Sequence, residues 1–471
     1  MSSQISRRDF LKTALTISGG TLLAACTPLG STPAPTSAPA AGPAATSVPA
    51  TAASAAGKKI TFSSYTWSSF EDSVNKILDN FEKLNPGVTV ERQLVGGDGY
   101  YDKLNTQIAS NTMPDVGIAD YGRTVSFAKS DLLLDITDMV ASSGFPLDKM
   151  VPAAVSHYRW KQGDFDSGAP DGRLYGLPSD AQSHIFAYNK KMFDDAGVSY
   201  PTDDWTWDDM LAAAKKITDP KQNRYGLYAN ATFGATSGLF QMPQRGVWLD
   251  AAGAAFHTPD YKKSLLDSPE TIAAFQWLWD LIYTHKVSPV PPTTNDVSAD
   301  PFVTKQAAMS AAGVWWLTDY GNALGPDEWD VAMFPKHPKT GKRTTTVESD
   351  GWWIYKSTKE PELSFKLLQY LANEAGQKMF TDVGYVVPSC FPDVAKGWYS
   401  QTPPTSKVKI LNNMVQDSAK IDTTYFQSAT INAITGPIID KAFTDGTDIV
   451  KALKDAAGAM NDELAKAWDQ F

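Results

Sequence analysis

The chain has little of what several common classes of protein require. It contains two cysteines, Cys26 and Cys390, and five scattered histidines, which together offer no zinc-like ligand spacing. Neither a Walker-type phosphate loop nor a nucleophile-elbow motif occurs in it. The apolar run near the start, residues 14–23, is only about ten residues long, and a helix that crosses a membrane needs roughly 20. We therefore expect no transmembrane anchor there, no bound metal and no cofactor.

Basic residues are also fewer than acidic ones, with 42 Lys and Arg against 52 Asp and Glu. The formal net charge is −10, and removing residues 1–25, which carry a net +2, leaves about −12. Nucleic-acid binding demands a basic face, so nucleic acid is excluded as a partner. The acidic balance says little about a neutral ligand.

The first 26 residues carry the strongest local signal. A basic start, a short apolar run and then small residues are typical of a bacterial export signal. Arg7-Arg8, followed by Phe-Leu-Lys at residues 10–12, resembles a twin-arginine signal, whose cargo crosses the membrane folded. Residues 23–26, Leu-Ala-Ala-Cys, resemble a lipobox, which implies a diacylglycerol on Cys26 and leaves no partner for an intrachain disulfide. The alternative is a chance cysteine at the end of an ordinary signal peptide.

The segment that follows is a tether. Residues 27–57 are almost wholly Pro, Ala, Ser, Thr and Gly, so they have little apolar surface to bury and should be disordered. Such a segment would hold the folded part off the membrane surface while letting it swing. About 414 residues remain from Lys58 onward, too many for a single core, so we expect two lobes.

The mature chain opens with a β-α-β pattern. Residues 59–62 form a short β-branched strand, and Ser68 with Glu71 makes a capping box for the helix that follows. Residues 85–87, Asn-Pro-Gly, end the helix, and residues 88–91 start a second strand. The apolar residues of the helix recur at helical spacing and predict one buried stripe: Val74, Ile77, Leu78, Phe81 and Leu84. A parallel sheet, and hence an α/β fold, is expected.

Further elements extend this pattern along the chain. Residues 101–109 are amphipathic, and residues 115–118 form a third strand. Thr206 caps another helix, and Ser268 opens a longer one. Residues 361–380 predict one more amphipathic helix.

Five segments of the mature chain resemble the extracellular solute-binding proteins of ABC importers, specifically the large sugar-binding family that includes maltose-binding protein. They follow one another in the family's order, and the third and fourth together are its most specific signature. The segments are residues 81–91, 108–116, 171–178, 188–198 and 302–313.

The resemblance implies a two-lobed, type II periplasmic-binding-protein fold with a ligand cleft between the lobes. It places hinge crossings of the chain near residues 178–181, 348–351 and 401–406. Lobe 1 would then comprise residues 58–180 and 350–402, and lobe 2 residues 181–349 and 403–471.

A sugar cleft needs two kinds of side chain. Sugar hydroxyls need paired donors and acceptors, and the C–H faces of the ring pack on aromatic rings. Both kinds follow predicted strands or stand where the family places ligand contacts. The candidate ligand residues are Tyr65, Trp67, Asp120, Tyr121, Asp180, Gln182, Phe233, Trp315 and Trp352.

Each candidate also has a structural interpretation. Tyr65 or Trp67 can pack against the start of its own helix, and Asp120 can cap a helix. Asp180 and Gln182 can form structural hydrogen bonds in the hinge. The tryptophan pairs 315–316 and 352–353 alternate on an extended backbone, so only the first of each pair is expected to face ligand.

The expected function is capture of a sugar or oligosaccharide by lobe closure and its delivery to an ABC permease. The expected protein is a monomer, exported and lipid-anchored at the outer face of the cytoplasmic membrane. Other interpretations remain open: the same fold binding a polyamine, metal or oxyanion, a sensor subunit or adhesin, or a surface-anchored glycoside hydrolase, which would need two carboxylates across the scissile bond.

Overall fold

The structure is a computed structural model that describes most of the chain from residue 57 onward, within one compact unit. The described residues are 57–66, 70–96, 99–164, 167–229, 244–291, 299–325, 327–382, 387–401, 419–421 and 428–468. The predicted export signal with Cys26, nearly all of the tether, and the candidates Trp67 and Phe233 lie outside these ranges. Within the described ranges, no helix combines the length and the apolar character needed to cross a membrane.

The predicted β-α-β unit forms the start of the first sheet. β1 (Lys58–Thr66) pairs in parallel with β2 (Val88–Gly96), and α2 (Phe70–Leu84) connects them. The apolar stripe of α2 is buried as predicted, apart from Leu84, which is 63% exposed. Leu84 is the last residue of α2, where the chain leaves the helix for the turn at residues 85–87, so it projects past the core.

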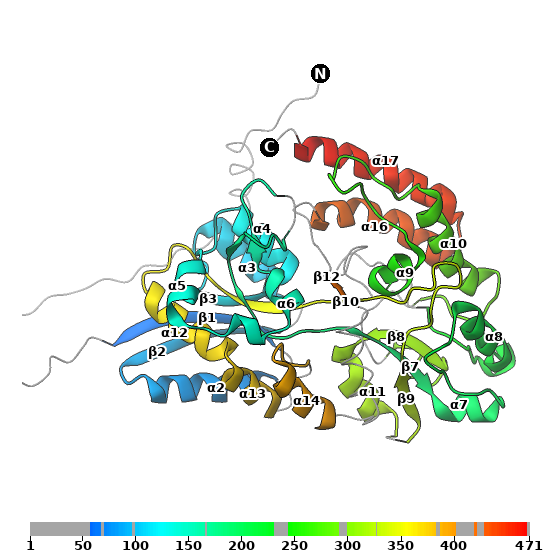
Figure 1. Ribbon diagram of the computed structural model, residues 1–471, viewed down its shortest axis with the longest axis horizontal. Helices are drawn as coiled ribbons and strands as arrows, with labels where there is room; N and C mark the ends of the chain where they lie inside the picture. Colours follow the sequence, from blue (N-terminus) through cyan, green and yellow to red (C-terminus); the bar gives the residue numbers. More distant parts are fainter. Residues whose placement is uncertain are drawn as a thin grey trace, which may run out of the picture. The chain divides into compact units, whose positions relative to one another are not determined.

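The first sheet has five strands in the order β2-β1-β3-β11-β6. α3 (Gly99–Ser110) leads to β3 (Val116–Asp120), which runs parallel to β1. β11 (Asp350–Ile354) and β6 (Leu177–Pro178) complete the sheet, and β11 is antiparallel to both of its neighbours. In Figure 1, α2 and α13 (Glu374–Asp382) lie on one side of this sheet, and α3 and α4 (Tyr121–Lys129) lie on the other.

A second, smaller sheet organises the other lobe. β7 (His184–Asn189) lies between β8 (Met309–Gly313) and β9 (Trp329–Ala332) and is antiparallel to both. Helices that the sequence predicts from their caps pack around it. Thr206 and Asp209 form a reciprocal capping box on α8 (Trp207–Ile217), and Ser268 caps α10 (Pro269–Tyr283).

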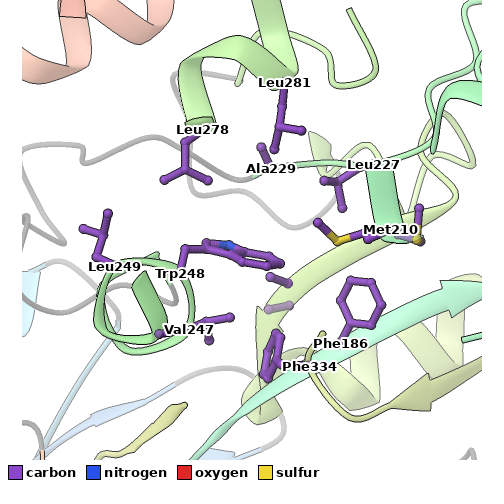
Figure 2. Close-up of a cluster of buried hydrophobic side chains, with 14 of the residues drawn as sticks. Phe186, Met210, Leu227, Ala229, Val247, Trp248, Leu249, Leu278, Leu281 and Phe334 are labelled. Carbon is purple, nitrogen blue, oxygen red and sulfur yellow. The ribbon is translucent and has the colours of Figure 1, made fainter. Parts of the chain in front are cut away.

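The core of this lobe is built around tryptophan. Figure 2 shows the Trp248 ring between Val247, Leu278 and Phe334. Trp248 is 1% exposed, and its ring meets that of Phe334 edge-on at a centroid distance of 6.0 Å. The ring of Trp277 lies tilted against that of Trp207, with the ring centroids 4.1 Å apart. These large rings bury much apolar area, so they stabilise the lobe by packing and are not available as a sugar platform.

Two chain segments connect the lobes side by side. One leads from β6 to β7, and the other from β10 (Thr345–Val347) to β11. They hold each other by backbone hydrogen bonds: Gln182 N–H donates to Glu348 O at 2.8 Å, Glu348 N–H donates back at 2.9 Å, and Ser179 N–H donates to Asp350 O at 2.8 Å. The hydrophobic cores on either side of this ladder are separate, one drawn from residues 60–177 and 352–387 and the other mainly from residues 185–334 and 431–464.

The predicted helix over residues 361–380 is instead two helices, α12 (Pro361–Ala372) and α13. The break is at Asn373, whose backbone is extended (φ −73°, ψ 169°). Its side-chain oxygen accepts a hydrogen bond from Gly376 N–H at 2.8 Å and so serves the start of α13. Asparagine competes for backbone donors in this way and favours helix ends over helix interiors.

The remaining elements fill the connections between these parts. They are α5 (Thr137–Ser143), η1 (Leu147–Lys149), α6 (Pro152–Ser156), β4 (Arg159–Trp160), β5 (Arg173–Leu174), α7 (Lys190–Asp195), η2 (Pro220–Gln222), η3 (Gln244–Leu249), α9 (Asp250–Ala252), η5 (Val314–Trp316), α11 (Leu317–Ala323), α14 (Pro392–Gln401), β12 (Ala419–Ile421), α16 (Ser428–Asp445) and α17 (Ile449–Trp468).

Candidate functional site

The strand order creates a natural place for a ligand. From β1 the chain moves to β2 on one side of the sheet, and from β2 it moves to β3 on the other side of β1. Ligands of open α/β sheets bind outside the carboxyl ends of the strands at such a switch point. Tyr65 is at the carboxyl end of β1 and Asp120 at that of β3, so two predicted site residues are brought to this edge.

Asp120 has a structural role at this edge. It is the N-cap of α4, and its Oδ1 accepts a hydrogen bond from Arg123 N–H at 2.9 Å. Its Oδ2 accepts from the Tyr101 hydroxyl at 3.2 Å and from the Arg123 guanidinium, which forms an ion pair with it. The guanidinium also lies over the Tyr101 ring, 3.7 Å from its centroid. The cap that the sequence allowed is therefore present, and Asp120 is largely committed to its protein partners.

Asp350 brings a second carboxylate to the same edge from the neighbouring strand. It is the first residue of β11 and lies directly opposite Asp120 in the antiparallel register. Its Oδ2 accepts hydrogen bonds from the Tyr65 hydroxyl at 2.5 Å and from Gln182 Nε2 at 3.1 Å. Tyr65, Asp120 and Gln182 were all proposed from the sequence, and Asp350 joins them.

The hinge contributes a third carboxylate, which is fully buried. Asp180 accepts hydrogen bonds from Gln182 Nε2 at 2.9 Å, from Asp350 N–H at 3.0 Å and from the Ser179 hydroxyl at 2.6 Å. The amide nitrogen of Gln182 thus bridges two carboxylates. Asp180 is 0% exposed and Gln182 is 8% exposed, so both act mainly as hinge structure in this state.

Burial and mutual repulsion control the protonation of the two bridged carboxylates. Burial raises the pKa of Asp350 to about 6, and the negative charge of Asp120 adds to that shift. Burial and the charge of Asp350 raise the pKa of Asp180 well above its ordinary value. Two carboxylates that share one amide donor resist ionising together, so the pair holds a proton at higher pH than isolated aspartates do.

Trp315 provides an aromatic surface near the hinge. Its partly buried ring packs against the hydrophobic cores of both lobes, whereas that of Trp316 packs only against the core of the second lobe. It also meets the buried His184 ring edge-on at 5.7 Å. The ring lies over Gly313, where any Cβ atom would overlap the indole. Glycine at the end of β8 is therefore what lets the ring lie there.

The local backbone at this tryptophan pair differs from the prediction. Residues 314–316 form the single 3-10 turn η5, not an extended strand. The two rings are consequently not on opposite faces of a strand, and what distinguishes Trp315 is its contact with both cores.

Two other candidates lie in hydrophobic surroundings. Tyr121 is 2% exposed, and its ring is 4.2 Å from that of His157. Trp352 is 1% exposed and packs between the rings of Phe62 and Phe380, at 5.6 and 6.0 Å. Neither ring offers a face to a ligand in this state, so we leave both out of the contact set proposed below.

Asp120 allows a prediction about stability. Changing Asp120 to Ala removes the acceptor that caps α4 and should lower the free energy of unfolding by about 1 kcal/mol in a urea titration. Asp120→Asn is the matched control, because asparagine caps equally well and the ion pair that it loses is partly exposed and worth little. If the Asn variant is destabilised as much as the Ala variant, the charge and not the cap is what matters.

Within the described residues, no group of three or more His, Cys, Asp or Glu side chains is arranged to hold a metal ion. The site instead presents carboxylates, an amide, phenols, a guanidinium and an indole. Such a set hydrogen-bonds hydroxyl groups and packs against an apolar ring face. A mixed five-stranded sheet, crossing strands to a second lobe and a polar site beside the crossings together define a two-lobed ligand-binding protein.

The chain belongs to the family of bacterial extracellular solute-binding proteins, whose model matches residues 67–378. It is 25% identical to the arabinooligosaccharide-binding protein of Halalkalibacterium halodurans, over 70% of this chain and 70% of the relative. It is 26% identical to the maltodextrin-binding protein MdxE of Bacillus subtilis, over 72% of this chain and 75% of the relative.

Solved structures show the same two-lobed fold. An ABC substrate-binding protein from Listeria monocytogenes, in complex with cycloalternan, matches with a TM-score of 0.74 at 24% identity, over 87% of this chain and 99% of that one. Maltose-bound MalE3 of T. maritima matches with a TM-score of 0.69 at 22% identity, over 86% and 99%. The α/β, two-lobed fold predicted from the sequence is confirmed.

Proposed function

We propose that this protein is the sugar-capturing subunit of an ABC importer, held by a lipid at the outer face of the cytoplasmic membrane. The observation that carries the proposal is the convergence of Tyr65, Asp120 and Asp350 at the carboxyl edge of the first sheet, beside the crossing strands, together with a half-buried Trp315 that packs against the cores of both lobes. Sugar hydroxyls need such acceptors and donors, and the apolar face of a sugar ring needs such an indole.

The relatives support a carbohydrate ligand. Those compared above are named for arabinooligosaccharides and maltodextrins, and the structural neighbours hold cycloalternan and maltose. We carry over only the class, a sugar or short oligosaccharide. The contacts that we propose are Tyr65, Asp120 and Trp315, and Asp180 and Gln182 position the neighbouring Asp350 from the hinge. Trp67 and Phe233 remain predictions from the sequence.

The proposed mechanism is closure of the two lobes around the ligand. We keep the predicted division into residues 58–180 with 350–402 and residues 181–349 with 403–471, and the hinge at the crossings between them. Closing excludes water and so strengthens every hydrogen bond to the sugar. It also creates the face that the permease recognises, and one copy of the chain is sufficient for capture.

The anchor serves this mechanism, because a soluble binding protein diffuses away from its permease unless it is held. The lipobox-like residues 23–26 place the lipid on Cys26, and residues 27–57 act as the tether. The twin-arginine-like start implies that the lobes fold before export.

Cys26→Ser tests the anchor separately from capture. The variant should move from the membrane fraction to the soluble fraction, because the acylated sulfur is lost, and it should still bind sugar with unchanged affinity. Cys390→Ser is the matched control and should stay in the membrane fraction, because Cys390 is buried in the folded protein. A Cys26→Ser variant that remains membrane-bound would rule out the lipid anchor.

A thermal-shift screen of the full-length protein tests the sugar assignment. The panel contains arabinotriose, maltotriose, mannotriose and D-mannitol, with spermidine and phosphate representing non-sugar solutes. A sugar that binds the native state raises the melting temperature by mass action. A response to spermidine or phosphate alone would overturn the sugar assignment.

Carboxylates facing each other across a site are also what a glycoside hydrolase uses. Asp120 and Asp350 instead lie opposite each other on adjacent strands of one sheet, and hydrogen bonds from the protein hold both oxygens of Asp120 and Oδ2 of Asp350. We therefore propose binding without hydrolysis. Product formation from maltotriose or arabinotriose, followed by chromatography, would contradict this.

A further inference from the structure

One oxygen of Asp350 is engaged by the protein and the other is not. We propose that Asp350 Oδ1 accepts a hydrogen bond from a hydroxyl group of the bound sugar and selects neutral sugars over acidic ones. This inference rests on the proposed sugar-binding function. Asp350, which belongs to no recognisable sequence motif, would then help to determine which sugars bind.

The hydrogen bonds around Asp350 leave one acceptor position open. Both donors that reach the side chain, the Tyr65 hydroxyl at 2.5 Å and Gln182 Nε2 at 3.1 Å, bind Oδ2. Among the described residues, no donor lies within hydrogen-bonding distance of Oδ1. Oδ1 is also not among the fully buried side-chain oxygen and nitrogen atoms that have no hydrogen-bond partner, so it retains some exposure to solvent. An unsatisfied carboxylate oxygen at a partly open site is a strong acceptor for a ligand hydroxyl.

Asp120, directly opposite in the strand register, does not compete for this role. Its two oxygens already accept from Arg123 N–H, the Arg123 guanidinium and the Tyr101 hydroxyl. Directly opposed residues on an antiparallel pair have Cβ atoms about 5 Å apart. A hydroxyl group bound at Asp350 is therefore held next to Asp120, whose Oδ1 accepts a single hydrogen bond and can accept another from a neighbouring hydroxyl of the same ring.

The charge at this position decides which sugars fit. Arg123 forms its ion pair with Asp120 and acts on Asp350 only at longer range, and no cation of the described residues lies within hydrogen-bonding distance of Asp350. A neutral sugar donates a hydrogen bond to the free oxygen and brings no charge that Asp350 would repel. A uronic acid would bring a further carboxylate against the ionised Asp350 in surroundings where water is excluded, so it is rejected by repulsion.

The Asp350 carboxyl group must be ionised for Oδ1 to act only as a hydrogen-bond acceptor, so sugar binding should depend on pH. Titratable and charged groups from several elements face Asp350 and set its ionisation: Tyr65, Tyr100, Tyr101, Asp120, Arg123, Tyr158 and Asp180. The pKa of Asp350 in the free protein is raised by burial to about 6. A carboxylate with a raised pKa takes up a proton as the pH falls through that value, so sugar affinity is full above pH 7 and weakens below pH 6.

The variant Asp350→Asn separates the loss of the acceptor at Oδ1 from the loss of the hydrogen bonds that hold Oδ2. The Tyr65 hydroxyl and Gln182 Nε2 both donate, so they should hold the single amide oxygen in the place of Oδ2. The amide nitrogen then replaces Oδ1 and presents a donor where the sugar needs an acceptor. The variant should fold at least as well as wild type, because it removes the repulsion with Asp180.

The test measures the affinity of the full-length protein by calorimetry at pH 7.5 and pH 5.0. The probes are the sugar of the thermal-shift panel that gives the largest shift, and trigalacturonate as the acidic probe. We expect the wild-type affinity for the neutral sugar to fall about tenfold between pH 7.5 and pH 5.0. Asp350→Asn should bind about 10- to 100-fold more weakly at pH 7.5 and show little change with pH. The exposed Asp148→Asn should behave as wild type, and trigalacturonate should not bind.

Two results would overturn the inference and leave the proposed function standing. One is an Asp350→Asn variant, folded by its melting temperature, that binds the neutral sugar as wild type does. The other is trigalacturonate binding as tightly as the neutral sugar. If no sugar binds the wild-type protein at either pH, the proposed function fails and this inference fails with it.

Discussion

Replacing Trp315 with alanine should weaken sugar binding about 10- to 100-fold and leave the fold intact. An indole that packs on a sugar face contributes about 1–3 kcal/mol of binding free energy through the apolar area that it buries. Its ring is only partly buried in the free protein and lies over Gly313, which has no side chain that would lose a contact when the ring is removed. The melting temperature should therefore change by only a few degrees, and calorimetry with the sugar identified in the screen measures the affinity.

Trp316→Ala is the matched control for this prediction. Trp316 is the adjacent residue of the same 3-10 turn, is also partly buried, and packs only against the core of the second lobe. Its loss should affect stability slightly and sugar affinity little. Unchanged affinity in Trp315→Ala, or an equal loss in both variants, would remove Trp315 from the site.

Trp352→Ala should have the opposite profile, a large loss of stability. Trp352 is 1% exposed and its ring stacks on that of Phe380. Truncating a buried tryptophan leaves a cavity and typically costs about 3–5 kcal/mol of unfolding free energy. Urea denaturation followed by circular dichroism should show the first lobe unfolding at a clearly lower urea concentration. Any fall in sugar affinity should follow from unfolding and recover at low temperature.

Trp352→Phe provides the control, because phenylalanine keeps most of the apolar contact and should cost less than half as much. A Trp352→Ala variant that unfolds like wild type and yet fails to bind sugar would mean that this ring contacts the ligand after all.

These two tryptophans show what local sequence can and cannot predict. Each begins a Trp-Trp pair shortly after a glycine, Gly313 or Gly351, and the sequence offered both as ligand contacts. The difference is tertiary. Trp352 lies in the interior of a five-stranded sheet under Phe380, whereas Trp315 lies in a turn that reaches both cores.

The helices and strands were mostly predictable because their signals are local. The capping box at Thr206 and the cap at Ser268 define helix starts, and both are present. The extra break at Asn373 was missed, since apolar residues continue at helical spacing on either side of it. Its signal was available, because asparagine often ends a helix.

Asp350 was missed for a different reason. The sequence places it in the hinge crossing, but its importance comes from the antiparallel pairing of β11 with β3, which brings it opposite Asp120 across 230 residues of sequence. Tyr101 was missed likewise, because only the fold brings the first turn of α3 to Asp120. Local patterns cannot report such pairings, whereas Tyr65 and Asp120 could be proposed because each follows a predicted strand and, for Tyr65, because the resembled family has ligand contacts there.

A crystal structure of the protein with the sugar identified in the screen would show directly whether Asp350 and Trp315 bind it. We expect one sugar beside the crossing strands, with a hydroxyl donating to Asp350 Oδ1 and a ring face against Trp315. Sugar bound elsewhere on the protein, or bound there without contact to either residue, would contradict it.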